Sequence, residues 1–269
     1  MFKLRLSLSL VTNIPRRRNI PIDVIVIDFF HWKHQGDWSF DPKFFPDPKA
    51  MVDELKSLNI ELMVSVWPTV EPASENWEEM LHKGLLIRHD RGPRVASEVG
   101  ATCTYFDATN PESRAFVWKQ NKKNYYDRGI KIFWLDEAEP EYCTYDFELY
   151  RYHAGPNLEV GNAYTRDYAR AFYDGMTGEG QENVVNLLRC AWAGSQKYGA
   201  LVWSGDIGSS WEAFRNQLAA GLNMGKSINV LRITNTHSLR LILRHGRHSL
   251  VDHRHRRLPR WQPIRPSLP

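Results

Sequence analysis

The chain has 269 residues, 42% hydrophobic and 12% aromatic, which is enough for one large core and excludes a disordered chain. Its net charge is +4, but residues 227–269 contain nine arginines and one acid and so carry +8. Residues 1–226 therefore carry −4, which excludes a basic protein body. The sequence lacks a run of about eighteen apolar residues, so we expect no membrane span.

The chain begins MFKLRLSLSLV, a basic end and a short apolar run, but no small-residue cleavage site follows. We interpret residues 1–15 as a leader that is disordered or foreign to the fold, and favour the cytoplasm over secretion. The three cysteines form neither a metal-binding spacing nor a disulfide framework, and we expect reduced, buried thiols: Cys103, Cys143 and Cys190.

Apolar runs and helical patterns then alternate along the chain. Five runs have the nearly continuous apolar character of strands covered on both faces: 22–30, 60–68, 130–136, 182–191 and 200–206. Five segments have helical spacing or helix boundary residues: 45–59, 76–84, 111–129, 162–176 and 210–225. In the first of these, Asp47 is the predicted N-cap and Pro48 the first helical residue. This order predicts parallel strands, in either an open doubly wound sheet or a barrel.

The strand ends distinguish the two folds. Each predicted strand ends in a polar or aromatic residue: Asp28, Trp67, Asp136, Arg189 and Asp206. In a β/α barrel these ends converge on one face. An open sheet would carry a glycine-rich loop after its first strand, where this chain has Phe-Phe-His-Trp at 29–32. We predict an α/β fold, a partial (β/α)8 TIM-type barrel with about five of eight strands.

Residues 226–269 form the predicted Arg/His-rich tail. Such charge would suit nucleic acid, but no aromatic platform or binding motif accompanies it, so we expect no nucleic-acid partner. We interpret the segment as disordered or as an out-of-frame translation product.

The strand-end residues suit a sugar ligand. Sugar rings stack on aromatic side chains, and their hydroxyls bond to carboxylates and guanidinium groups. Glycoside hydrolysis also needs two carboxyl groups with opposite roles. A single strand-end aspartate is more often a helix cap or an ion-pair partner, but three of them, with Arg189 and several tryptophans, favour a site.

Several segments, in order, resemble glycoside hydrolase family 31, the retaining α-glucosidases and α-xylosidases. The likeness runs from Arg16 to Gly225, and the form WLDEAE with the long insertion after it is most similar to the α-xylosidase branch. The segments are NIPIDVIVIDFFHW, GDWSFDPKFFPDPKAMVDELKSLNIELMVSVWP, FDATNPESRAFVW, FWLDEAEPE and LLRCAWAGSQKYGALVWSGD.

The resemblance implies a role for each matching residue. Asp136 falls on the nucleophile, Asp206 on the general acid/base, and Glu139 on a supporting position, whereas Glu137 and Glu141 are expected to be loop charges. The implied substrate-binding residues are Asp28, Arg189, Trp203, Phe30, Trp32 and Trp67. The resemblance implies no metal and no cofactor, and it implies an oligosaccharide substrate as the partner. It also allows that the full-length family member forms an oligomer.

The resemblance also predicts a domain organisation. Residues 16–225 correspond to barrel strands 2 to 6, and family patterns expected before and after them are replaced by other sequence. We expect an incomplete barrel to pack loosely or aggregate, with little turnover. The predicted function is a retaining α-xylosidase; the alternatives are an α-glucosidase of the same family and an inactive carbohydrate-binding fragment.

Overall fold

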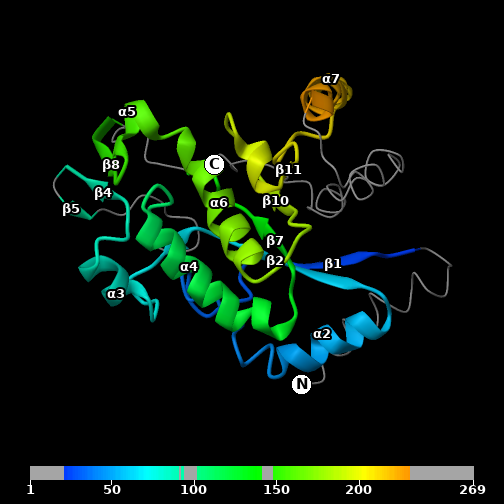
Figure 1. Ribbon diagram of the computed structural model, residues 1–269, viewed down its shortest axis with the longest axis horizontal. Helices are drawn as coiled ribbons and strands as arrows, with labels where there is room; N and C mark the ends of the chain where they lie inside the picture. The colour runs from blue at the N-terminus through cyan, green and yellow to red at the C-terminus, as the bar shows by residue number, and fades with distance from the viewer. Residues whose placement is uncertain (1–20, 91, 94–101, 141–147, 231–269) are drawn as a thin grey trace, which may run out of the picture. The chain divides into compact units, whose positions relative to one another are not determined.

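The structure, a computed structural model, describes residues 21–90, 92–93, 102–140 and 148–230 (Figure 1). The predicted leader lies outside these residues, as does the predicted tail from residue 231 onward. The chain divides into two compact units, the first ending at Val202 and the second beginning at Trp203.

A five-stranded parallel sheet forms the centre of the first unit, in the order β1-β2-β7-β10-β11. Its strands are β1 Val24–Ile27, β2 Glu61–Val66, β7 Ile132–Leu135, β10 Asn186–Leu188 and β11 Ala200–Val202. Each strand lies within one of the predicted apolar runs; α-helices separate the first four along the chain, and a short 3-10 helix separates β10 from β11. The predicted α/β class with parallel strands is confirmed.

The helices also match the predicted segments. They are α2 Pro48–Ser57, α3 Trp77–His82, α4 Pro111–Asn124 and α6 Ala163–Gly178 in the first unit, and α7 Trp211–Val230 in the second. The Asp47 side chain accepts a hydrogen bond from the Ala50 N–H at 2.9 Å, and Pro48 opens α2, as predicted. After α4, the 3-10 turn η1 Tyr126–Arg128 ends at Gly129, whose φ of 101° suits glycine.

Helices α4 and α6 lie side by side next to the sheet (Figure 1). The Phe133 ring of β7 lies 5.1 Å from that of Phe172 in α6 and 6.4 Å from that of Trp118 in α4. A Cβ atom at Gly175 of α6 would lie 2.2 Å from the Trp118 ring. The absence of a side chain at this helical position therefore lets the two helices approach closely.

Two small antiparallel sheets lie in the insertions after β2 and β7. One pairs β3 Thr69–Val70 with β6 Thr104–Tyr105, and the other has the order β5-β4-β8-β9. The latter's strands are β4 Arg88–His89, β5 Gly92–Pro93, β8 Tyr150–Tyr152 and β9 Gly155–Pro156. These strands, together with α5 Asn157–Val160 and η3 Ser195–Tyr198, are additions to the predicted elements.

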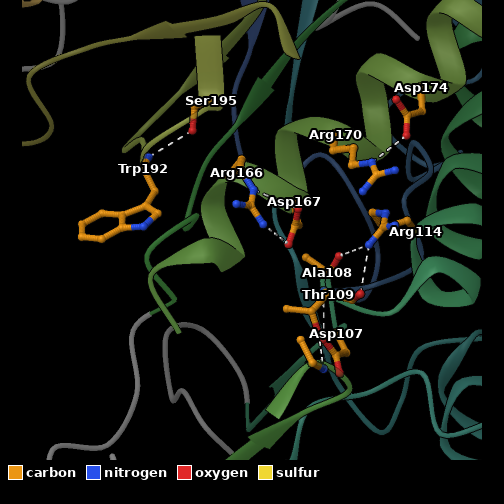
Figure 2. Close-up of polar contacts among 11 residues, drawn as sticks. Asp107, Ala108, Thr109, Arg114, Arg166, Asp167, Arg170, Asp174, Trp192 and Ser195 are labelled. Atoms are coloured by element: carbon orange, nitrogen blue, oxygen red, sulfur yellow. Dashed lines mark hydrogen bonds and ion pairs between the residues drawn. The ribbon is translucent and has the colours of Figure 1, made fainter. Parts of the chain in front are cut away.

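A buried aspartate anchors the second insertion to the first (Figure 2). The Asp107 carboxylate accepts hydrogen bonds from the backbone N–H and hydroxyl of Thr109 at 2.9 and 2.7 Å, and from the His153 N–H. The Thr109 hydroxyl accepts from the Ala154 N–H at 3.1 Å, while Arg114 of α4 donates to the carbonyls of Ala108 and Thr109. The turn between β8 and β9 is thereby fixed to the start of α4.

Candidate active site

Three predicted site residues directly follow three neighbouring strands. Trp67 follows β2, Asp136 follows β7 and Arg189 follows β10. The strands end in register, since Leu135 pairs with both Val66 and Leu188. Beyond them, the Asp136 N–H donates to the Val66 carbonyl at 3.0 Å and the Arg189 N–H to the Leu135 carbonyl at 3.3 Å. The ladder therefore places Asp136 between Trp67 and Arg189.

The Asp136 carboxylate is buried, with 2% of the residue exposed. Its Oδ2 accepts a hydrogen bond from the Trp67 indole N–H at 3.2 Å, and its Oδ1 lies 3.6 Å from Nη1 of Arg189. A neutral donor on one oxygen and a guanidinium near the other both stabilise negative charge on this carboxylate. Asp136 is therefore held in one orientation at the strand end.

Arg189 contacts two further carboxylates. Its Nε lies 2.6 Å from Oε1 of Glu139, and its Nη1 lies 3.4 Å from Oε1 of Glu137. Glu137, expected to be a loop charge, does lie in the loop after β7, but it is buried there, with 6% of the residue exposed. Its left-handed φ of 52° turns the chain immediately after Asp136, where the Glu137 carboxylate contacts the guanidinium. Glu141 lies outside the described residues.

Aromatic side chains surround the Trp67 indole. The Phe29 ring stacks on it with centroids 5.1 Å apart and an interplanar angle of 26°, and the rings of Phe30 and Trp32 each lie 5.7 Å away. Phe30 has a left-handed φ of 61° and is 53% exposed. Asp28 directly follows β1 and accepts a hydrogen bond from the Phe29 N–H at 2.8 Å. The structure thus brings Phe30, Trp32 and Trp67 together and adds Phe29, which the sequence prediction had omitted.

Tyr168 of α6 supports the end of β2 through a buried hydrogen bond. Its buried hydroxyl donates to the Val66 carbonyl at 2.8 Å, the same oxygen that accepts from the Asp136 N–H. Burial raises the pKa of Tyr168 well above its usual value, and the charges of Asp136 and Glu137 raise it further. The hydroxyl is therefore a neutral donor. No feature of the sequence singled out Tyr168, which belongs to an ordinary amphipathic helix.

The other two predicted site residues follow β11. Trp203 and Asp206 belong to the second unit, so the pairing of Asp206 with Asp136 stays a prediction. Cys103 is buried and Cys190 half-buried, whereas Cys143 lies outside the described residues. Within the described ranges, no cluster of three His, Cys, Asp or Glu side chains could hold a metal ion, and no helix is long and apolar enough to cross a membrane.

Residues 8–230 match the family model for the glycosyl hydrolases family 31 TIM-barrel domain. The chain belongs to glycoside hydrolase family 31. This assignment identifies the parallel sheet and its helices as part of a TIM-barrel domain, as predicted.

Relatives in family 31 carry xylosidase and glucosidase names. An uncharacterized family 31 glucosidase from Pseudescherichia vulneris is 63% identical over 78% of this chain and 40% of its own length. Alpha-xylosidase A of Aspergillus niger is 36% identical over 77% of this chain and 31% of its own. A crystal structure of a family 31 alpha-xylosidase from a soil metagenome, complexed with xylose, is 63% identical with a TM-score of 0.78, over 81% of this chain and 32% of that one. The chain thus spans two fifths or less of the length of these relatives.

Proposed function

We propose that this chain carries the nucleophile and the sugar-binding wall of a retaining α-glycosidase that acts on α-xylosides. The observation that supports this most is the Asp136 carboxylate, buried at a barrel strand end between the Trp67 N–H and the Arg189 guanidinium. A carboxylate oriented in this way suits attack on an anomeric carbon better than it suits a structural ion pair.

In this proposal, catalysis takes two steps. An Asp136 oxygen bonds to the anomeric carbon while the bond to the leaving oxygen breaks, and Asp206 gives its proton to that oxygen. Asp206 then accepts a proton from water, the water oxygen bonds to the anomeric carbon, and the ester to Asp136 breaks. A retaining enzyme holds its two carboxyl groups about 5 to 5.5 Å apart.

The neighbouring side chains have binding roles. We assign Asp28 and Arg189 to the sugar hydroxyls, because carboxylate and guanidinium groups form paired hydrogen bonds with them. The exposed Phe30 offers a stacking face beside Trp67. Glu139 supports the site through its 2.6 Å contact with the Arg189 Nε. The full substrate-binding set proposed is Asp28, Arg189, Trp203, Phe30, Trp32 and Trp67.

The xyloside preference is supported by relatives named alpha-xylosidase that are 36% and 35% identical. The glucosidase name of the 63% identical relative favours a glucoside as the second candidate. Steady-state rates on fluorogenic aryl α-xyloside and α-glucoside measure this choice directly. Although an incomplete barrel is expected to turn over little, we expect the kcat/KM to be higher for the xyloside, and the reverse order would replace the first candidate by the second.

The nucleophile is tested by substitution and by covalent trapping. Asp136→Ala is expected to lower turnover by about 10³-fold or more, whereas Asp174→Ala, at an exposed aspartate of α6, is expected to leave it unchanged. A 5-fluoroxylosyl fluoride should label the peptide that contains Asp136. Sugar binding without turnover or labelling would indicate the inactive carbohydrate-binding fragment instead, and labelling of another carboxylate would contradict the assignment.

A further inference from the structure

His31 is a buried imidazole that the proposed reaction does not use. The residue is 3% exposed, its Nδ1 lies 2.8 Å from the Asp28 carbonyl oxygen, and its Nε2 lies 2.8 Å from the Tyr125 hydroxyl. A carbonyl oxygen only accepts hydrogen bonds, so Nδ1 carries the proton. In the neutral ring Nε2 then accepts, and the Tyr125 hydroxyl donates. The two contacts fix one tautomer.

The imidazole is not suited to proton transfer with substrate. Both nitrogens are occupied by protein groups, and burial lowers its pKa to about 4, against a smaller upward effect of the bond to Asp28. Its ring also packs among aromatic side chains, with centroids 4.6 Å from Trp32 and 5.1 Å from Phe40. These contacts point to a positioning function.

The segment that His31 holds is the loop from 28 to 32. Besides the side-chain bond to the Asp28 carbonyl, the His31 carbonyl accepts from the Asp41 N–H at 2.7 Å. Between these two attachments lies Phe30, whose φ of 61° is uncommon for a residue with a side chain. Such a conformation persists only where neighbouring contacts impose it. The His31 contacts supply that restraint.

The same loop reaches the candidate nucleophile through two contacts. Phe29 stacks on Trp67, and the Trp67 N–H donates to Asp136. A shift of the Asp28 carbonyl would therefore move the Asp28 carboxylate and the aromatic rings that face Trp67. Tyr125, at the end of α4, holds the imidazole from the opposite side.

We propose that His31, oriented by Tyr125, is a positioning residue that sets the loop 28–32 for sugar binding beside Asp136. The inference rests on the proposed function for the purpose of the loop, but its geometry can be tested without turnover. His31 acts through Asp28 and the loop aromatics and does not itself contact the substrate.

Two substitutions separate the two bonds of the imidazole. His31→Asn places an amide nitrogen near the Nδ1 position and keeps the bond to Asp28, whereas His31→Gln reaches the Nε2 position and keeps the bond to Tyr125. Each variant loses one buried hydrogen bond, so we expect similar falls in thermal midpoint. Only His31→Gln releases the loop. We expect its kcat/KM on an aryl α-xyloside to be about five- to tenfold below that of His31→Asn, and Tyr125→Phe to resemble His31→Asn.

Nuclear magnetic resonance of the full chain, labelled with ¹⁵N at histidine and tryptophan, gives the readout that is independent of turnover. We expect His31 in the Nδ1–H tautomer at neutral pH, and a Trp67 indole N–H resonance that shifts in His31→Gln but not in His31→Asn. An Nε2–H tautomer, or equal Trp67 shifts in the two variants, would overturn the positioning role. If the wild-type chain hydrolyses no aryl α-glycoside, the proposed function fails, and the Trp67 resonance still decides the role of His31.

Discussion

Replacing Arg189 by glutamine tests whether one guanidinium stabilises the cluster at the strand ends. Three carboxylates lie near it, at 2.6 Å for Glu139, 3.4 Å for Glu137 and 3.6 Å for Asp136, and 18% of the arginine side chain is exposed. At an effective dielectric constant of about 20, each of these attractions is worth about 5 to 6 kcal/mol. Desolvation and repulsion among the carboxylates offset most of this sum. Because the variant leaves buried carboxylates without that cation, we expect a loss of about 3 to 5 kcal/mol in the free energy of unfolding.

Urea unfolding at neutral pH, followed by circular dichroism, measures this loss. Lys83→Gln is the matched control, because Lys83 pairs with Glu79 on the surface, with side-chain exposures of 57% and 51%, and its loss should cost about 1 kcal/mol or less. Adding Glu137→Gln to Arg189→Gln should recover part of the loss, since one of the carboxylates then becomes neutral. A cost for Arg189→Gln no larger than that of Lys83→Gln would refute the reasoning.

Two further predictions concern buried titratable groups. Burial lowers the pKa of His31 from 6.5 to about 4. Between pH 6.5 and pH 4 the unfolded chain therefore binds a proton that the folded chain does not. About 3 kcal/mol of the free energy of unfolding should be lost as the pH falls through this range. Urea midpoints should show this loss in the wild type and not in His31→Asn, and parallel pH profiles would contradict it. Asp107→Asn replaces one acceptor oxygen of the Figure 2 cluster by a donor and should cost about 1 to 3 kcal/mol, because a donor then faces Thr109 or His153. An unchanged urea midpoint would contradict this cost, because it would show that the cluster accommodates the new donor.

Much of the fold followed from local chemistry. The apolar run 60–68 contains β2, whose residues Leu62–Val66 are buried, and the Asp47 cap with Pro48 marked the start of α2. The short strands were not predictable, because a two-residue ladder such as β4 has no periodicity of its own. It exists because His89 pairs with Tyr150, 61 residues later in the chain, and such pairing depends on the insertions folding together.

The candidate site was likewise predictable from the sequence only in part. The strand-end positions of Trp67, Asp136 and Arg189 followed from the ends of the apolar runs, and parallel pairing brings them together. The burial of Glu137 depends on a left-handed backbone turn and on a partner 52 residues away, and neither can be read from the letters DEAEPE. Tyr168 was missed for a similar reason, because its carbonyl partner, Val66, is 102 residues distant.

The close crossing of α4 and α6 has a consequence for how this sequence can diverge. Glycine in a helix interior costs about 1 kcal/mol relative to alanine, so drift toward alanine would ordinarily be favoured at Gly175, whereas Gly178 is the last residue of α6. Apart from its chain neighbours and the backbone of α6, a Cβ at Gly178 would meet no atom within 4 Å, whereas one at Gly175 would collide with the Trp118 ring. Position 178 is therefore open to replacement, and position 175 can gain a side chain only when residue 118 becomes smaller. Among homologues, positions 118 and 175 should vary as a pair.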